Sequence, residues 1–344
     1  MRKLLNVLYV TSPEGYLSRD GRNVVVRVGE EEKARFPIHI LESIVCFTYA
    51  GASPALMELC AESGVALSFL SESGKFLARL TGPMTGNVLL RRKQYRMADD
   101  RTAAAAIVRN LIIAKTTNSR TVIRRAMSDH GEVVGDTRLQ RAFNDLTQIV
   151  QRVLECPDDV EALRGWEGQA ANAYFSGFND LIRNPEQAFR FNTRTRRPPR
   201  DPVNALLSFA YTLLRHDVQS ALETVGLDPY VGFLHTDRPG RPSLALDLME
   251  ELRPYLADRL VLTLINRKQL TPKDFVVSET AGVVLTTEAR KAVLGAWQER
   301  KRETIEHPFL NERIEVGLIP HVQALLLARY IRGDLDGYPP FIWR

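Results

Sequence analysis

The pattern of hydrophobic residues changes near residue 83, and this change limits the possible folds more than any other feature of the chain. Before it, short β-branched runs such as 24–28 are bounded by turn residues, which is typical of strands. After it, apolar residues recur at helical spacing over long stretches. A chain of 344 residues is also too long for one ordinary core. We therefore predict an α+β protein with a small N-terminal β-sheet domain, similar to a β-sandwich, over residues 1–83 and a larger, mostly α-helical domain over residues 84–344.

Local signals place the elements of the N-terminal domain. Ser53 is a good N-cap, Pro54 suits the first turn of a helix, and Gly64 suits the position after its end, so a helix is predicted between them. The predicted strands are residues 1–10, 24–28, 38–40, 44–47, 65–70 and 75–80, with a hairpin turn at 71–74.

The larger domain is predicted to contain amphipathic helices and one small hairpin. Asp158 or Asp159 can cap a helix that continues to about Ile182. Asp201 followed by Pro202 is a second strong start signal, for a helix that ends near residue 225. The other predicted elements are helices at 103–114, 137–154, 287–303 and 311–332 and a hairpin at 276–285.

The composition predicts a cytoplasmic protein without membrane contact. No apolar run reaches the roughly 20 residues that a bilayer-spanning helix needs. The apolar N-terminal stretch has no small-residue cleavage site after it, so we predict a strand there rather than a signal peptide. Cys46, Cys60 and Cys156 lie far apart and form no CxxC motif, which is typical of a reducing compartment and argues against structural zinc.

The positive charge lies entirely in the second part of the chain. The formal net charge is +5, a mild excess. Residues 1–75 contain 8 Lys and Arg against 9 Asp and Glu, whereas the remainder contains 38 against 32. Any anionic partner is therefore expected to bind the predicted helical domain.

Glu167 lies on or beside the apolar face of the helix predicted to start at residue 158 or 159. Its helical neighbours are Leu163, Ala170, Ala171 and Tyr174. An unpaired carboxylate at such a position is costly because it loses its hydration. Two interpretations remain open: Glu167 pairs with a nearby arginine such as Arg164, or it helps to hold a cation.

His235, Asp247 and Glu250 provide further candidate ligands. Ser243 is predicted to cap a helix from which Asp247 and Glu250, three residues apart, project on one side. His235 ends an apolar run and precedes the loop to this helix. With Glu167, these groups would suit Mg²⁺ or Mn²⁺, which prefer oxygen ligands and tolerate one imidazole. The alternatives are a solvated acidic face shared with Glu251 and a hydrogen-bonded, partly buried His235.

The segment 187–200 contains five arginines and no acidic residue, which are Arg190, Arg194, Arg196, Arg197 and Arg200. Guanidinium groups bind phosphate oxygens in pairs, so the segment is predicted to contact a DNA backbone. Arg238 and Arg241 lie close to His235 in the sequence and are predicted to hold a reacting phosphate. A solvated loop between helices is the alternative for the segment 187–200.

In combination, these segments resemble the CRISPR-associated adaptation integrase, the larger of the two proteins common to most spacer-acquisition systems. The chain looks most similar to the type I-C branch of that family. Three segments carry the resemblance, with the same order and spacing: residues 167–175, 196–211 and 232–251.

The resemblance implies a metal-dependent DNA endonuclease and integrase that joins the 3′-hydroxyl ends of a short duplex, the protospacer, to the CRISPR repeat. It implies that Glu167, His235 and Glu250 are the catalytic metal ligands and that Asp247 supports them, although Asp247 and Glu250 can exchange these roles. It further implies a homodimer that assembles with a small ferredoxin-like adaptation partner on double-stranded DNA.

Two other functions are compatible with the residues. A non-catalytic DNA-binding scaffold would use the carboxylates for structure only. A metal-dependent phosphohydrolase would act on nucleotides, but the chain has no glycine-rich Walker loop.

Overall fold

The computed structural model describes residues 7–12, 14–47, 49–71, 76–80, 88–129, 138–279 and 281–343. The chain forms two compact units. The first comprises residues 1–85, 285–303 and 315–318, and the second comprises residues 86–284, 304–314 and 319–344. The predicted boundary between residues 83 and 84 lies outside the described residues.

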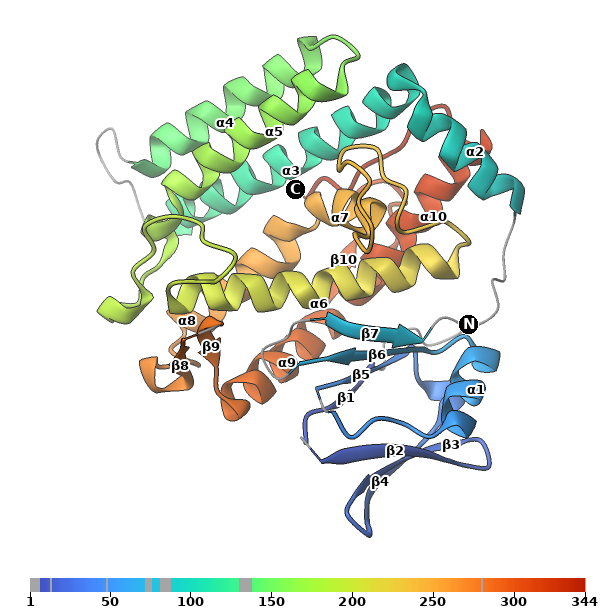
Figure 1. Ribbon diagram of the computed structural model, residues 1–344. Coiled ribbons are helices and arrows are strands. Elements are labelled where there is room, and N and C mark those ends of the chain that lie inside the picture. Colours follow the sequence, from blue (N-terminus) through green and yellow to red (C-terminus); the bar gives the residue numbers. More distant parts are fainter. Residues whose placement is uncertain are drawn as a thin grey trace. The chain divides into compact units, whose positions relative to one another are not determined.

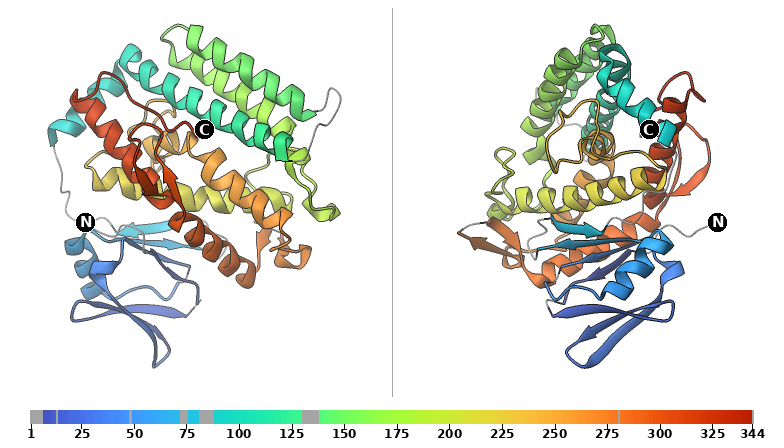
Figure 2. Two further views of the ribbon diagram at one scale, coloured as in Figure 1. Left: turned by 180° about the vertical axis from the view of Figure 1, so that it is seen from behind. Right: turned by 45° about the vertical axis from the view of Figure 1, so that its right-hand side comes forward.

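The described residues of the first unit form two β-sheets and the α-helices α1 (Pro54–Ser63) and α9 (Thr287–Arg302) (Figures 1 and 2). One sheet has the order β1-β5-β6-β7, in which the first three strands are parallel and the last is antiparallel. Its strands are β1 (Val7–Val10), β5 (Ser43–Cys46), β6 (Ala66–Leu70) and β7 (Phe76–Leu80). The other sheet is antiparallel and consists of β2 (Gly15–Asp20), β3 (Asn23–Val28) and β4 (Glu31–Pro37). Apolar residues of both sheets and of α1 form the core.

Helix α1 follows its predicted signals. The Ser53 hydroxyl accepts a hydrogen bond from the Leu56 N–H, and Gly64 ends the helix with φ 65°, a conformation that favours glycine. The strand predicted at residues 38–40 is wrong, because this segment forms a 3₁₀ turn that buries Ile38 in the core. The predicted hairpin turn at 71–74 lies mostly outside the described residues.

The second unit is mostly helical, which confirms the predicted α+β class (Figure 1). Its α-helices are α2 (Val88–Asp99), α3 (Arg101–Asp129), α4 (Arg138–Glu155), α5 (Val160–Ser176), α6 (Pro202–Thr224), α7 (Ser243–Glu250), α8 (Arg259–Asn266) and α10 (Ile319–Arg332). A π-helical turn, Arg253–Asp258, joins α7 to α8. Two small sheets of two strands each are also present: β8 (Phe275–Ser278) with β9 (Gly282–Leu285), and β10 (Thr304–Glu306) with β11 (Arg313–Glu315). Helices α3, α4 and α5 lie side by side, and α6 packs on α7 and α10.

The helix starts in the second unit follow their predicted caps with one exception. The Asp159 carboxylate caps α5, and the Asp201 carboxylate accepts a hydrogen bond from the Asn204 N–H at the start of α6. Ser243 is not the cap of α7, because the helix already begins at this residue and Pro242 precedes it. Helix α5 ends at Ser176, earlier than predicted. Within the described ranges, no helix is both long and apolar enough to span a membrane.

Candidate functional site

Glu167 and Glu250 lie on either side of the Lys115 ammonium group. Lys115 Nζ is 2.6 Å from Glu250 Oε2 and donates a hydrogen bond to Glu167 Oε1. The three residues come from α7, α5 and α3, so three helices bring their charges to one point. The side chains of Lys115 and Glu250 are only 11% and 3% exposed. These three residues are called the carboxylate cluster below.

Arg253 adds a second positive charge on Glu250. Its Nη1 is 2.7 Å from Glu250 Oε1, one helical turn further along the chain. Burial raises the pKa of the Glu250 carboxyl, but the charges of Arg253 and Lys115 oppose this and lower the pKa to about 2. Glu250 is therefore ionised at neutral pH. Its Oε2 atom is buried and has no partner at hydrogen-bonding angles, so the contact with Lys115 is ionic.

Asp247 fixes the position of His235. Asp247 Oδ2 accepts hydrogen bonds from the N–H groups of Phe233 and Leu234, at 2.6 and 2.9 Å. Its Oδ1 accepts one from the His235 N–H at 2.9 Å and lies 2.6 Å from His235 Nδ1. Gly232 permits this approach, because a Cβ atom there would lie 2.7 Å from Asp247 Oδ2. His235 Nε2 is therefore the ring nitrogen that remains for a ligand.

The predicted alternatives for the acidic residues are wrong in two respects. Asp247, Glu250 and Glu251 are all buried, so they do not form a solvated acidic face. Glu167 is half-buried, but its partner is Lys115 and not Arg164. Arg164 instead contacts Glu161 and donates a hydrogen bond of 2.6 Å to a backbone carbonyl oxygen of the His235 loop.

A pocket of about 420 Å³ brings Glu167 and His235 together with three arginines. Its lining residues are Arg164, Glu167, Leu234, His235, Thr236, Arg238 and Arg241. Burial lowers the pKa of Arg241, and the positive charges of Arg238, Arg164 and Arg197 lower it further. Several guanidinium groups thus share one field, which favours an anionic ligand such as a phosphate group.

The donor set fits a divalent cation in its chemistry. Two carboxylates and an imidazole are typical ligands of Mg²⁺ or Mn²⁺, and a positive charge already lies between the two carboxylates. The buried Glu250 Oε2 atom lacks a directed hydrogen bond. Among the described residues, however, no three His, Cys, Asp or Glu side chains lie close enough together to hold a metal. In this arrangement the Lys115 ammonium group lies between the two carboxylates.

Two cations of this site, Lys115 and Arg253, were missed from the sequence. The signal for Lys115 lies in its own helix. Lys115 follows the Ala- and Ile-rich stretch predicted as a helix at 103–114 and lies 52 residues before Glu167. The available signal was a lone lysine on a mostly buried helix, since buried lysines are almost always paired.

The arginine segment 187–200 contains inward and outward side chains. Arg194 donates hydrogen bonds to Asn204 Oδ1 at 2.8 Å and to Ser208 Oγ at 3.1 Å, and it stacks over the Tyr211 ring. Burial lowers its pKa. Arg194 therefore holds the segment on α6. The exposed members are Arg190, Arg196, Arg197 and Arg200.

The segment 187–200 lies beside the carboxylate cluster. Arg196 lines a small cavity of about 20 Å³ together with Lys115 and Arg253. The Pro199 carbonyl oxygen accepts a hydrogen bond of 2.9 Å from the Val283 N–H. The preceding residue, Gly282, has φ 72° and leaves no space for a Cβ atom, so its glycine permits this close contact.

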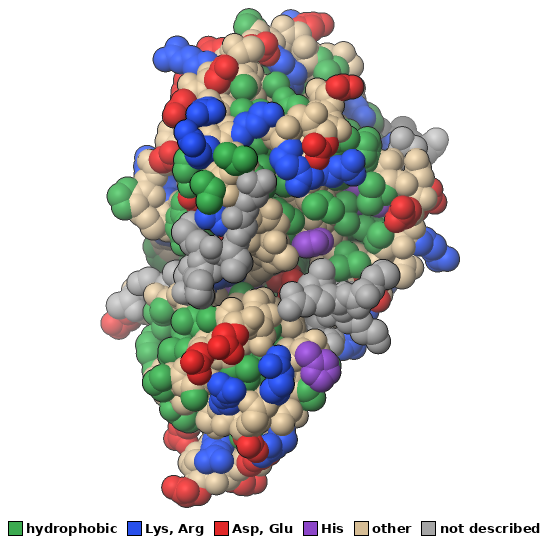
Figure 3. Space-filling view, turned by 90° about the vertical axis from the view of Figure 1, so that its right-hand side faces the viewer, with side chains coloured by type: hydrophobic (Ala, Val, Ile, Leu, Met, Phe, Trp, Pro, Cys, Tyr) green, Lys and Arg blue, Asp and Glu red, His purple; other side chains and the backbone are tan. Residues whose placement is uncertain are grey.

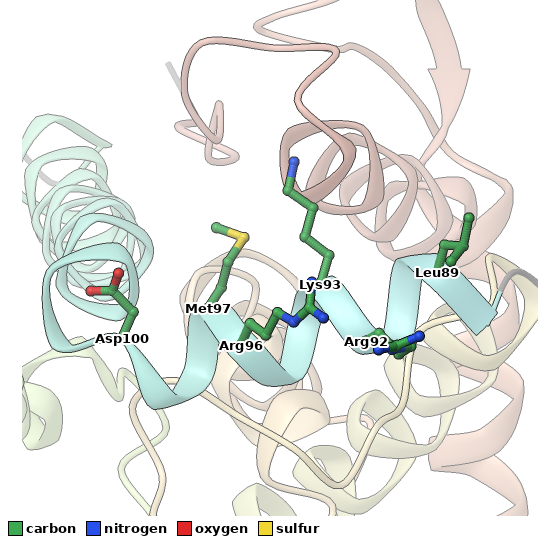
Figure 4. Close-up of a pocket in the computed structure, with 6 residues that line it drawn as sticks. All are labelled: Leu89, Arg92, Lys93, Arg96, Met97 and Asp100. Atoms are coloured by element: carbon green, nitrogen blue, oxygen red, sulfur yellow. The ribbon is translucent and has the colours of Figure 1, made fainter.

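A second basic pocket, of about 470 Å³, lies on α2 and contains no residue of the carboxylate cluster (Figure 4). Its lining residues are Leu89, Arg92, Lys93, Arg96, Met97 and Asp100. Leu89, Lys93 and Met97 project from one side of the helix (Figure 4). In the view of Figure 3, Lys and Arg side chains are interspersed with hydrophobic ones on this unit. This pocket can bind an anion but lacks paired carboxylates and an imidazole for catalysis.

The family of the chain follows from its similarity to known proteins. Residues 8–299 match the family described as CRISPR associated protein Cas1. The chain belongs to the Cas1 family. The CRISPR-associated endonuclease Cas1 1 of Chlorobaculum tepidum is 53% identical to it over 344 residues, which cover the whole of both chains.

Two solved structures share the Cas1 fold. A casposase bound to its integration product has a TM-score of 0.83 at 21% identity, with 98% of this chain and 94% of that one covered. A Cas6-RT-Cas1–Cas2 complex also gives 0.83, at 23% identity, with 99% of this chain and 36% of that chain covered. At these identities the likeness concerns the fold alone.

Proposed function

We propose that this Cas1-family chain is a metal-dependent DNA endonuclease and integrase of CRISPR spacer acquisition. One observation carries the proposal. Glu167 and Glu250 meet around a positive charge, beside a pocket in which His235 faces Arg238 and Arg241. A negative carboxylate pair next to a phosphate-binding surface is the combination that metal-dependent phosphodiester chemistry needs.

In this proposal Glu167, His235 and Glu250 hold Mg²⁺ or Mn²⁺. Asp247 is the supporting residue, because its carboxylate is already used by three backbone N–H groups and the His235 ring. When bound, the metal lowers the pKa of the attacking hydroxyl group and neutralises charge on the target phosphate.

The proposed reaction is a transesterification. The 3′-oxygen of the incoming strand attacks a phosphorus atom of the repeat, and a new P–O bond forms while the bond to the 3′-oxygen of the cut strand breaks. The attacking hydroxyl loses one proton and the leaving oxygen gains one. Because one phosphodiester bond replaces another, no ATP is needed. With water as the attacking group, the same site would nick DNA.

Positively charged side chains hold the DNA in this proposal. Arg238 and Arg241 bind the reacting phosphate from the pocket, and affinity falls steeply as salt rises. The exposed arginines of the segment 187–200 bind the backbone further along: Arg190, Arg196, Arg197 and Arg200. Arg194 is left out of this role, because its guanidinium is bound within the protein.

We further propose that the chain is a cytoplasmic homodimer of the type I-C branch, acting with a small ferredoxin-like partner on protospacer and repeat DNA. The similarity in fold to a Cas6-RT-Cas1–Cas2 complex supports the partner, and the similarity to a casposase bound to its integration product supports strand transfer.

A DNA-binding scaffold without catalysis is the second candidate function. The observation that favours it is that Lys115 and Arg253 together balance the charges of both carboxylates without any metal. A scaffold would bind duplex DNA in a salt-dependent manner but would not cut or join it.

The two candidates differ in a strand-transfer assay. A short duplex with 3′-hydroxyl ends is incubated with a repeat-bearing plasmid, the small partner, Mn²⁺ and the protein. We expect joined products from the wild type, none from Glu167→Gln, and wild-type amounts from Glu155→Gln, an exposed glutamate on α4. Full activity of Glu167→Gln would refute the catalytic role, and salt-sensitive binding without any product from the wild type would favour the scaffold.

A further inference from the structure

We propose that Lys115 is a placeholder cation, which holds Glu167 and Glu250 together until a divalent cation takes its position and which must move away for that cation to bind. This inference rests on the metal site of the proposed function. The Lys115 ammonium group then competes with the metal ion for the position between Glu167 and Glu250, so that metal binding is an exchange of one cation for another.

The geometry separates Lys115 from the other cation of the site. Lys115 Nζ contacts both carboxylates, through Glu167 Oε1 and through Glu250 Oε2 at 2.6 Å. Arg253 contacts Glu250 alone, through the other oxygen, Oε1, at 2.7 Å. A metal ion shared by Glu167 and Glu250 would therefore overlap the position of the ammonium group and leave the Arg253 contact intact.

The carboxylates need a cation even before a metal arrives. Glu250 is 3% exposed and keeps only Arg253 as a cation when Lys115 is absent. Glu167 would add like-charge repulsion at close range. Lys115 contacts both carboxylates and offsets this repulsion, which favours the close approach of α5 and α7 at this site.

The side chain of Lys115 is suited to leave. An ammonium group on a flexible four-carbon chain can change its position more easily than a planar guanidinium that is held by several bonds. A small cavity adjoins Lys115, and its wall includes the short side chains of Ser119 and Ala170 and the carboxylate of Asp258. The cavity measures about 20 Å³, which is room for a group the size of one water molecule, and Arg196 and Arg253 line it beside Asp258.

The test measures Mn²⁺ affinity by isothermal titration calorimetry on the intact protein. We expect Lys115→Met to bind Mn²⁺ about tenfold more tightly than the wild type, since no ammonium has to be displaced. Arg253→Met is the matched control, because it also removes one positive charge from Glu250 without clearing the shared position. Its gain should be clearly smaller. Unchanged or weaker affinity of Lys115→Met, or an equal gain in both variants, would overturn the inference.

A measurement on the wild type keeps the inference testable if a variant does not fold. In crystals soaked with Mn²⁺, anomalous scattering locates the ion and the map locates Lys115 Nζ. The inference requires that Nζ lies more than 4 Å from both carboxylates when the ion is bound. An ion bound by Glu167 and Glu250 with Nζ still between them would contradict it.

The failure of this inference differs from the failure of the proposed function. Strand transfer that depends on Glu167, with Nζ unmoved by Mn²⁺, would refute only the placeholder. Displacement of Nζ by Mn²⁺ without any strand transfer or nicking would refute only the function. No Mn²⁺ binding by either the wild type or Lys115→Met would refute both.

Discussion

Glu250 and Glu251 are adjacent in the chain and both buried, yet their surroundings differ in kind. Glu250 faces Lys115 and Arg253, and these charges outweigh burial and lower its pKa to about 2. Glu251 faces neutral donors, and burial raises its pKa to about 7 although these donors oppose the shift. Glu250 is held by two positively charged side chains, and Glu251 by directed hydrogen bonds from neutral donors.

The surroundings of Glu251 join α7 to α10 and to the last described residues. Glu251 Oε1 accepts hydrogen bonds from Gln323 Nε2 at 3.0 Å and from the Tyr338 hydroxyl at 2.6 Å, and Oε2 accepts one from the Phe341 N–H at 2.9 Å. Asn118 of α3 adds bonds to the backbone of Glu251 and Phe341. These five residues are called the C-terminal lock below.

The carboxylate cluster can exchange the cation that it binds, whereas the C-terminal lock cannot exchange its hydrogen-bond donors. In the carboxylate cluster one flexible ammonium group lies between two acids, of which Glu250 also contacts Arg253, so another cation can replace the ammonium group. In the C-terminal lock every donor has a fixed direction and belongs to a packed element, so no replacement fits. We therefore expect substitutions in the first region to change activity and those in the second to change stability.

The largest expected effect is that of Glu250→Gln on activity. An amide is a poor ligand for a divalent cation and lacks the negative charge, so the rate of strand transfer should fall roughly a thousandfold, which corresponds to about 4 kcal/mol. The rate is measured in the plasmid assay, and circular dichroism shows that the variant is folded. A variant that retains a tenth of the activity would contradict the role of Glu250.

Glu251→Ala should lower stability and leave activity nearly unchanged. It leaves the Tyr338 hydroxyl, the Phe341 N–H and the Gln323 amide buried without their acceptor, which should lower the free energy of unfolding by roughly 3 kcal/mol. Urea unfolding measures this change. The activity of the folded fraction should stay within a few-fold of the wild type, and a loss as large as that of Glu250→Gln would remove the distinction between the two regions.

The pH dependence of stability sharpens the comparison. The pKa of Glu251 rises from 4.5 in the unfolded chain to about 7 in the fold, so the folded state binds more protons between these values. The contribution of Glu251 to stability is therefore fully present below pH 4.5 and is lost as the pH rises through 7, a total of about 3 kcal/mol. Urea unfolding at pH 5, 6 and 7 should show this decrease in the wild type and in Glu250→Gln. Glu251→Gln should show a smaller decrease, which comes from Asp258, because burial raises the pKa of that carboxyl to about 6. An equal slope in all three proteins would contradict the assignment.

Short-range signals in the sequence predicted much of the fold. Ser53, Gly64 and Asp201 mark helix ends because a cap depends only on the next few residues. The parallel order β1-β5-β6 and the inclusion of residues 285–303 in the first unit depend on contacts between distant segments, which no local pattern contains.

The candidate site was predicted to a similar extent. The apolar neighbours of Glu167 indicated an inward carboxylate, and the structure places it in one pocket with His235. Lys115 was missed because its importance depends on two helices that lie far away in the sequence. Glu251 was grouped with a solvated face, since its partners at residues 323–341 give no signal near it.

Asp247→Asn tests how far metal binding at the candidate site depends on the contact between Asp247 and His235. The amide cannot accept from three N–H groups and the imidazole at once, so the His235 ring should lose its fixed orientation. We expect Mn²⁺ affinity to fall about 10- to 100-fold, as is typical for partners of metal-binding histidines. Titration calorimetry measures this change, and an affinity equal to that of the wild type would assign Asp247 to the loop alone.

The smallest expected effect is on DNA affinity and concerns Arg238 and Arg241, which line the pocket beside His235. Arg238→Ala or Arg241→Ala removes one cation near the reacting phosphate, so the slope of log affinity against log salt should fall by about one for each. Arg152→Ala, on the exposed end of α4, is the control and should leave the slope unchanged. Fluorescence anisotropy of a labelled duplex between 50 and 200 mM salt measures the slope. Because these substitutions leave both carboxylate regions intact, they should change neither the free energy of unfolding nor Mn²⁺ affinity. A loss of stability would show that the two arginines support the His235 loop instead of binding DNA.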